Sequence, residues 1–219
     1  MKIGFVGLSH LGIVSAVVAA SKGNSIIAYG DQFELKKIGS KRININEPNL
    51  NSFYFKYKKR ITFTNSIKDL EKSDIIYISQ DIPTDKNGNS NLSSISKIIK
   101  KISLFKKKKI LVILSQVPPG FTRKIYWPSH KLYYQVETLI FGSAVSRALK
   151  PERIIIGCSN SQNKISKKLK NYLDCFKCPI FKMKYESAEL AKISINMYLI
   201  SSITITNLLC QICEKTSAK

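Results

Sequence analysis

The amino-acid sequence predicts an α/β fold in which a doubly wound, mostly parallel sheet is followed by a long helix. Three observations support this fold class. Short apolar segments alternate with amphipathic ones along the chain, and two of the apolar segments (74–79 and 110–115) are unbroken, as in the buried strands of parallel sheets. A glycine turn (Gly7–Gly12) joins the first strand directly to the first helix. From 186 to 214, apolar residues recur at helical spacing, which predicts the long helix.

The strands are predicted from short runs of apolar, mainly β-branched and aromatic residues that are bounded by turn residues. The first run begins at Ile3 and ends in the glycine turn, and the second follows the Gly23-Asn24 turn. The expected strands are 3–7, 25–29, 61–64, 74–79, 110–115, 133–137, 153–157 and 180–183.

The helices are predicted where apolar residues recur every three or four positions after a turn or a capping residue. Ser66 is a plausible cap for a short helix, and the polar Gly/Asn loop 85–91 precedes a longer one. The segment that runs through Glu47-Pro48 is expected to be a polar stretch. The expected helices are 11–22, 34–39, 66–72, 92–104, 164–176 and 186–214.

The turn at Gly7–Gly12 has the spacing G-x-S-x-x-G, with Ser9 at the position of the middle glycine. Glycine permits a tight turn, and the free N–H groups and positive dipole end of the new helix attract a pyrophosphate. This order of strand, turn and helix indicates a Rossmann-like dinucleotide-binding unit. His10 is expected to contribute a backbone N–H to it rather than acid–base chemistry. The other turns expected at the same edge of the sheet are 30–31, 80–84 and 115–120.

The charge of the chain is strongly basic. The 219 residues include 36 Lys and Arg against 14 Asp and Glu, a net charge of +22, and 44% of them are hydrophobic. This apolar content is sufficient for a proper core, so disorder is not expected. A charge of this size attracts polyanions, but the basic runs 56–60 and 106–109 lie between apolar segments and lack interleaved aromatic residues. We therefore interpret the lysines as solvated helix faces, and nucleic-acid binding remains a remote alternative.

The cysteines indicate a reducing compartment, because their number is odd and their spacing is not that of a disulfide framework. They are Cys158, Cys175, Cys178, Cys210 and Cys213. The last four form two C-x-x-C pairs, but the pairs are far apart and the second lies within a helical pattern. No metal site is therefore expected, and the predicted location is the cytoplasm.

The N-terminus resembles a signal peptide in having Lys2 before an apolar run. Gly4, Gly7 and Gly12 interrupt the run and a second strand follows it, so secretion is not expected. No other segment is expected to be apolar over a length sufficient to span a bilayer, and no membrane partner is predicted.

Six segments stand in a fixed order along the chain. They are G-L-S-H-L-G at 7–12, N-E-P-N-L at 46–50, S-D-I-I-Y-I-S-Q-D-I-P-T at 73–84, S-Q-V-P-P-G-F-T-R at 115–123, E-T-L-I-F-G-S-A-V-S-R-A-L-K-P-E-R-I-I-I-G at 137–157 and E-S-A-E-L-A-K-I-S-I-N at 186–196. In this order they resemble the UDP-glucose/GDP-mannose dehydrogenase family, and in particular its members that act on UDP-glucose. The resemblance implies an enzyme that oxidises the C6 alcohol of a nucleotide sugar to a carboxylate with two NAD⁺. The reaction passes through an aldehyde and a thioester on a cysteine.

The resemblance also implies roles for individual residues. Lys192 and Asn196 match the family's lysine and asparagine that face the reacting carbon, and their spacing places both on one helix face. An ammonium there stabilises oxyanion charge, and an amide orients a sugar hydroxyl or water. Glu137 matches the acid/base glutamate; without the resemblance, Lys192 and Glu137 would be taken for surface residues. The expected cofactor contacts are Gly7, Ser9, His10, Leu11 and Gly12 with the pyrophosphate, Asp31 with the ribose, and Pro83 and Ser115 on the nicotinamide side.

The chain departs from the family pattern at four places. Gly30 stands where the family has the acid at the end of the second strand, Gln116 replaces a catalytic threonine, and Phe141 replaces a second glutamate. The nucleophilic cysteine of the family lies in a Gly-rich segment beyond the long helix, and none of the five cysteines has that context. The chain by itself is therefore not expected to convert UDP-glucose to UDP-glucuronate.

The expected organisation is an NAD-binding domain over 1–184 and the beginning of a central dimerisation helix over 185–219, with the family's C-terminal UDP-binding domain absent. A homodimer is expected to form through the helix Glu186–Glu214. The alternative is a non-catalytic remnant that binds nucleotide or pairs with a full-length subunit, which the changes at Gln116 and Phe141 favour.

Overall fold

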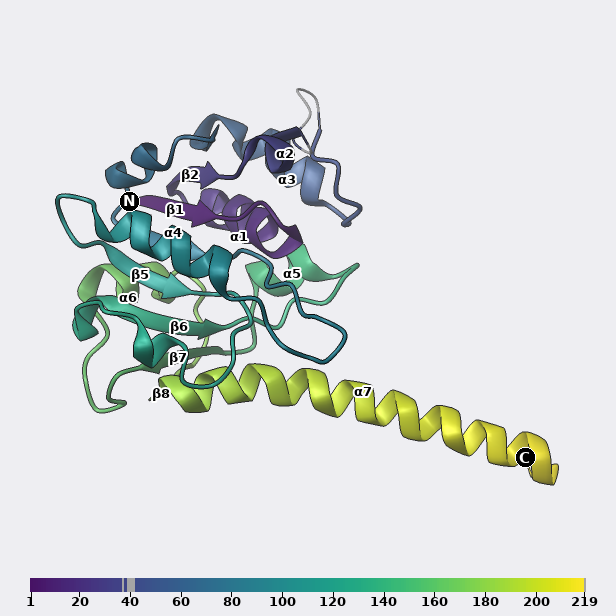
Figure 1. Ribbon diagram of the computed structural model, residues 1–219. Helices are drawn as coiled ribbons and strands as arrows, with labels where there is room; N and C mark the ends of the chain where they lie inside the picture. Colours follow the sequence, from purple (N-terminus) through teal and green to yellow (C-terminus); the bar gives the residue numbers. More distant parts are fainter. Residues whose placement is uncertain (37, 39–41, 219) are drawn as a thin grey trace.

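One sheet of eight strands forms the centre of the protein, in the order β3-β2-β1-β4-β5-β6-β7-β8 (Figure 1). The computed structural model describes residues 1–36, 38 and 42–218. Neighbouring strands are parallel except for β6 and β7, which are antiparallel. The strands are β1 (Lys2–Val6), β2 (Ser25–Tyr29), β3 (Ile61–Thr64), β4 (Ile75–Ile78), β5 (Ile110–Ile113), β6 (Leu132–Val136), β7 (Ile154–Cys158) and β8 (Ile180–Lys184). The predicted fold class, a doubly wound and mostly parallel sheet, is confirmed.

Helices cover both faces of this sheet. The helices are α1 (His10–Ser21), α2 (Gln32–Lys36), α3 (Leu50–Tyr57), α4 (Ser93–Ser103), α5 (Ala144–Leu149), α6 (Lys167–Asp174) and α7 (Tyr185–Thr216). Buried side chains of α1, α5 and α6 share one apolar core with the sheet, and those of α4 and the first turn of α7 share the core on the opposite face. The strand order reverses beside β1, which lies between β2 and β4. In doubly wound folds, ligands bind outside the carboxyl ends of the strands at this reversal.

Two of the helices were not predicted, and one predicted helix has another form. α3 follows the stretch expected to be polar. Its apolar residues Leu50, Phe53, Tyr54 and Tyr57 recur at helical spacing and pack on the core, so the pattern that predicts a helix was present there and was overlooked. α5 has six residues, which is too short for a periodic pattern. The segment Ile67–Lys72 is a 3-10 helix rather than an α-helix. The helix predicted over 34–39 corresponds to α2, and its end at residues 37 and 39 lies outside the described residues.

The long helix α7 packs on the sheet only through its first turns and then extends away from the body of the protein (Figure 1). A Cβ at Gly157 of β7 would lie 2.9 Å from Cβ of Ala188, which shows how closely the first turns approach the sheet. The exposed large apolar side chains of α7 are Leu190, Ile195, Met197, Tyr198, Leu199, Ile200, Ile203, Ile205, Leu208, Leu209 and Ile212. The chain therefore presents a long apolar helix with no cover among the described residues.

The expectation that no further segment is long and apolar enough to span a bilayer was wrong. An 18-residue window of α7 has a mean hydropathy of 1.5, and none of that window is buried. By length and composition alone this helix could cross a membrane. A helix that pairs with another protein helix passes the same test, because both need a continuous apolar surface.

A buried carboxylate joins α7 to the loop after β5. Glu189 is fully buried, and its two oxygens accept the backbone N–H groups of Gly120 at 2.6 Å and Thr122 at 2.8 Å. Both donors belong to a loop in which Gly120 has a positive φ of 90° and a 3-10 turn begins at Thr122. The backbone of such a loop forms no regular hydrogen-bond ladder. The carboxylate supplies the acceptors that the loop lacks.

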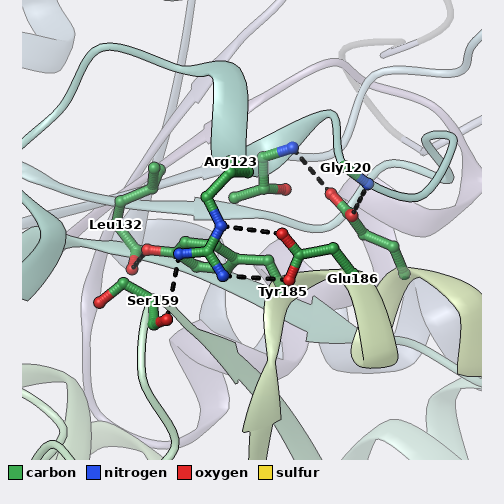
Figure 2. Close-up of polar contacts among 8 residues, drawn as sticks. Gly120, Arg123, Leu132, Ser159, Tyr185 and Glu186 are labelled. Carbon is green, nitrogen blue, oxygen red and sulfur yellow. Dashed lines mark hydrogen bonds and ion pairs between the residues drawn. The ribbon is translucent and has the colours of Figure 1, made fainter.

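A second contact lies beside it on the surface (Figure 2). Arg123 donates two parallel hydrogen bonds to Glu186, of 2.8 Å and 3.0 Å, and a third to the carbonyl of Ser159 at 3.0 Å. The hydroxyl of Tyr185 donates to the carbonyl of Leu132 at 2.8 Å. The Arg123 hydrogen bond lowers the pKa of Glu186 to about 2. The angle at which α7 leaves the sheet is thus set by polar contacts within its first five residues.

Replacement of Glu189 by glutamine is expected to lower the free energy of unfolding by about 1–3 kcal/mol, since the amide has one acceptor oxygen and leaves a buried N–H without a partner. Urea denaturation followed by circular dichroism measures this loss. The control is Glu186→Gln, whose side chain is 40% exposed and whose loss is expected to stay below about 1 kcal/mol. Equal losses in the two variants would contradict the role assigned to Glu189.

Candidate functional site

The glycine turn after β1 tolerates no side chain at two positions. Gly7 has φ of 97°, and a Cβ there would lie 2.6 Å from Cα of Gln80. A Cβ at Gly12 would lie 2.0 Å from the carbonyl oxygen of Gly7. Ser9 is the N-cap of α1: its hydroxyl accepts the N–H of Gly12 at 3.3 Å and donates to the carbonyl of Ser79 at 3.0 Å. The serine at the middle position is therefore a structural cap that also ties β1 to the end of β4.

The turn fits the pyrophosphate of a dinucleotide. In the first turn of α1, the N–H groups of His10 and Leu11 have no carbonyl four residues earlier within the helix, so they are available to an anion. The first turn contains no acidic residue of its own, and the positive end of the helix dipole attracts an anion. The missing side chains at Gly7 and Gly12 let the backbone approach a phosphate closely.

The end of β2 carries two carboxylates, Asp31 and Glu34. Asp31, the predicted ribose contact, is exposed, and its carboxylate accepts the N–H of Glu34 at 2.7 Å. The carboxylate of Glu34 accepts in turn from the N–H of Leu8 at 2.8 Å, in the glycine turn. Sequence reasoning did not single out Glu34, although the D-x-x-E spacing of Asp31 and Glu34 is a capping-box signature that could have pointed to it.

The two residues predicted on the nicotinamide side lie at or just beyond the carboxyl ends of β4 and β5. Ser115 is buried, and its hydroxyl donates to the carbonyl of Gln80 at 2.5 Å and lies 3.3 Å from that of Ile78. It therefore joins the ends of the two strands. Pro83 is exposed in the loop after β4, where its carbonyl accepts the N–H of Asn91 at 2.8 Å.

The predicted catalytic lysine and glutamate lie together. Nζ of Lys192, in α7, donates to the backbone carbonyl of Glu137 at 2.6 Å, directly after β6. Burial raises the pKa of Glu137, against the opposing effects of the Thr138 N–H and of the Lys192 charge. Burial lowers the pKa of Lys192, against the charge of Glu137. The surroundings thus shift the pKa of both groups towards neutral pH, which suits them to proton transfer.

The predicted amide lies one helical turn further along α7. Nδ2 of Asn196 donates to Oε1 of Gln116 at 2.8 Å. Glu137, Lys192 and Asn196 all line a cavity of about 630 Å³ between α7 and the sheet. The structure thus brings together three residues that are up to 59 positions apart in the sequence, from Glu137 to Asn196, and adds Gln116 as a partner of the amide.

Glu47 is a buried carboxylate beside the glycine turn, and sequence reasoning assigned it no role. Its buried carboxylate accepts the N–H groups of Gly142 at 2.9 Å and Ala144 at 2.8 Å, and lies 3.0 Å from Nε2 of His10. Burial opposes ionisation, but these hydrogen bonds prevail and lower the pKa of Glu47. The ring of Phe141 packs against that of His10, with centroids 4.3 Å apart. Glu47 therefore fixes the loop after Glu137 against the glycine turn.

A doubly wound sheet with a glycine turn at its switch point is the architecture of a dinucleotide-binding domain. Residues 1–174 match the sequence model described as "UDP-glucose/GDP-mannose dehydrogenase family, NAD binding domain". The chain belongs to this family, and the resemblance found from the six segments is confirmed.

Individual relatives support the same assignment. The chain is 30% identical over 231 residues to a UDP-glucose 6-dehydrogenase of Bacillus subtilis, covering 99% of this chain and 50% of the relative. It is 28% identical over 230 residues to a UDP-glucose 6-dehydrogenase of Rickettsia bellii, covering 100% of this chain and 53% of the relative. The chain thus spans about half the length of these two curated relatives.

Solved structures share the fold. A UDP-D-ManNAc dehydrogenase of Pyrococcus horikoshii superposes with a TM-score of 0.86 at 22% identity, over 99% of this chain and 55% of the other. A GDP-mannose dehydrogenase of Pseudomonas aeruginosa, solved as a ternary complex, superposes with a TM-score of 0.84 at 22% identity, over 94% and 52%.

The raised pKa of Glu137 sets the sign of a pH-dependent stability. Below the unfolded value of about 4.5 the carboxyl is neutral in both states, and stability is lost as the pH rises through the higher folded value. Glu137→Gln is therefore expected to be more stable than the parent at pH 7 and equal to it below pH 4.5. Thermal unfolding at a series of pH values measures this difference. Glu152→Gln, exposed at the surface, is the control and is expected to change little at either pH. A destabilised Glu137→Gln at pH 7 would contradict the assignment.

Proposed function

We propose that this chain is the NAD-binding part of a nucleotide-sugar 6-dehydrogenase that oxidises UDP-glucose to UDP-glucuronate in two steps. The observation that carries the proposal is the meeting of Lys192 with Glu137 at the rim of the cavity, with Asn196 beside them. The NAD-binding turn lies at the carboxyl edge of the same sheet. NAD⁺ supplies the hydride acceptor for such an oxidation.

The chain's own residues divide the remaining chemistry. The Lys192 ammonium stabilises negative charge as it develops on the sugar oxygen, and the Asn196 amide holds a hydroxyl or water. Glu137 exchanges protons with that group, which its raised pKa favours near neutral pH. The three act within a partly enclosed space, where such charges interact more strongly than in water.

The choice of UDP-glucose follows from the two curated relatives described above, which are named UDP-glucose 6-dehydrogenases. The solved structures of the same fold include enzymes whose names give GDP-mannose and UDP-D-ManNAc as substrates.

Two contacts favour a second candidate, a nucleotide-binding subunit without complete catalysis. The Gln116 carbonyl oxygen, at the position of the family's threonine, accepts a hydrogen bond from Asn196. Phe141, at the position of a family glutamate, packs on His10. Both positions therefore carry groups that bind neighbouring side chains rather than an attacking water. In this case the chain retains the NAD site and acts beside a complete subunit.

A homodimer through α7 is part of the proposal. The later turns of α7 expose a row of apolar residues that a second copy of the chain can cover. The hydrogen bonds of Glu186 and Glu189 hold the first turn of the helix against the body of the protein. We also propose a cytoplasmic location, in which the five cysteines stay reduced.

Titration with NADH tests the cofactor site. The chain is expected to bind one NADH per subunit in a saturable isotherm measured by calorimetry. Gly12→Ala is expected to abolish binding, because its Cβ would lie 2.0 Å from the Gly7 carbonyl and must displace α1 from the turn. Ser21→Ala, at the other end of α1, is the control. A folded parent chain that does not bind NADH would contradict the proposed cofactor site.

Light scattering after size-exclusion chromatography tests the dimer. The parent chain is expected to elute as a dimer, and the double variant Ile200→Glu with Ile203→Glu as a monomer, because buried charges oppose helix pairing. The control Ser201→Glu adds a charge at an exposed polar position of the same helix. A monomeric parent chain would refute the proposed arrangement.

A further inference from the structure

We propose that the carboxylate of Glu34 binds the adenosine ribose of NAD and disfavours the 2′-phosphate of NADP. Glu34 would thereby replace the acid that Gly30 lacks. The inference rests on the proposed NAD site and deepens it by naming a specificity residue. It replaces Asp31, the residue that the sequence predicts for this contact.

Gly30 provides no side chain at the end of β2, where dinucleotide-binding folds carry an acid for the ribose hydroxyls. A Cβ at Gly30 would lie 2.6 Å from Cδ1 of Leu8 and 3.0 Å from Oε2 of Glu34. The space beside Gly30 is therefore already filled, on one side by an apolar side chain and on the other by a carboxylate.

Glu34 reaches this space from the third position of α2. Its Oε1 accepts the N–H of Leu8 at 2.8 Å, and its Oε2 accepts the N–H of Asp31 at 3.2 Å. Leu8 follows Gly7 in the turn that fits the pyrophosphate. One oxygen of Glu34 is thus attached to the turn, and the other to the residue after Gly30.

The carboxylate of Asp31 has a different use. It accepts the N–H of Glu34 at 2.7 Å, so that Asp31 and Glu34 form a reciprocal capping box at the start of α2. A capping box accounts for both bonds between these two residues. It does not account for the bond to Leu8, which lies 26 positions earlier in the chain and belongs to the dinucleotide turn.

The Glu34 carboxylate retains acceptor capacity. Each oxygen of an ionised carboxylate can accept about two hydrogen bonds, and each Glu34 oxygen accepts one N–H from the described residues. The remaining lone pairs can accept from neighbouring ribose hydroxyls. A 2′-phosphate would instead meet a like charge. Burial and then the charges of Asp31 and Glu34 raise the pKa of Tyr29, since both carboxylates lie near this end of β2.

Calorimetric titration of the 219-residue chain with NADH and with NADPH at pH 7 tests the proposal. The parent chain is expected to prefer NADH by about tenfold or more. Glu34→Gln keeps a capping oxygen but loses the charge, so it is expected to weaken NADH binding about tenfold and to remove most of the preference. Asp31→Asn is the matched control: it removes one charge at the same helix end and retains a cap, and its preference is expected to stay that of the parent.

A Glu34→Gln chain that keeps the parent's preference overturns the proposal, and so does an equal loss in Asp31→Asn, since that outcome would reflect general charge. Should Glu34→Gln fail to fold, Glu34→Asp is titrated in its place. The shorter carboxylate no longer reaches Leu8, so NADH binding is expected to weaken about tenfold, and unchanged binding overturns the proposal. A parent chain that binds neither dinucleotide refutes the NAD site itself, whereas failure confined to the Glu34 variants leaves the NAD site intact.

Discussion

The close approach of α1 to the end of β1 is the constraint on which the rest of this structure depends. The Gly7 carbonyl and the Gly12 backbone are so near that a methyl group at Gly12 would lie 2.0 Å from the oxygen. This contact fixes where α1 begins, and so where its unpaired N–H groups lie relative to β2 and β4. The anion site, the ribose end of β2 and the loop after β4 all take their positions from it.

Carboxylates provide a second common feature. The chain has 14 acidic residues against 36 basic ones, yet its glutamates repeatedly accept backbone N–H groups from segments distant in sequence. Glu34 binds the glycine turn, Glu47 binds the loop after Glu137, and Glu189 binds the loop after β5. Loops lack the internal acceptors of helices and strands, and an ionised carboxylate supplies two strong ones. In a basic protein these few carboxylates define the shape of the functional edge.

The long helix α7 begins at the sheet and then extends away from it (Figure 1). Its first turns place Lys192 and Asn196 over the cavity, and its later turns expose an apolar surface. Since α7 is one continuous helix, a partner that packs on its later turns would also stabilise the turns that carry Lys192 and Asn196. One helix thus carries both the side chains that line the cavity and the exposed apolar surface.

The sequence by itself determined the fold class, the strand order along the chain, the glycine turn and the family, because each depends on local spacing or on the order of short segments. It also indicated Lys192, Asn196 and Glu137 as candidates. The helix α5 escaped prediction because six residues are too short for a periodic pattern, whereas α3 does carry apolar residues at helical spacing and was overlooked. Only the tertiary structure decided that Asp31 caps a helix while Glu34 reaches the turn, that Glu47 joins residues 95 and 97 positions away, and that α7 stands uncovered. The contacts of Glu34 and Glu47 with these segments join groups that are far apart in the sequence and come together only when the chain folds. Local sequence patterns therefore cannot reveal them.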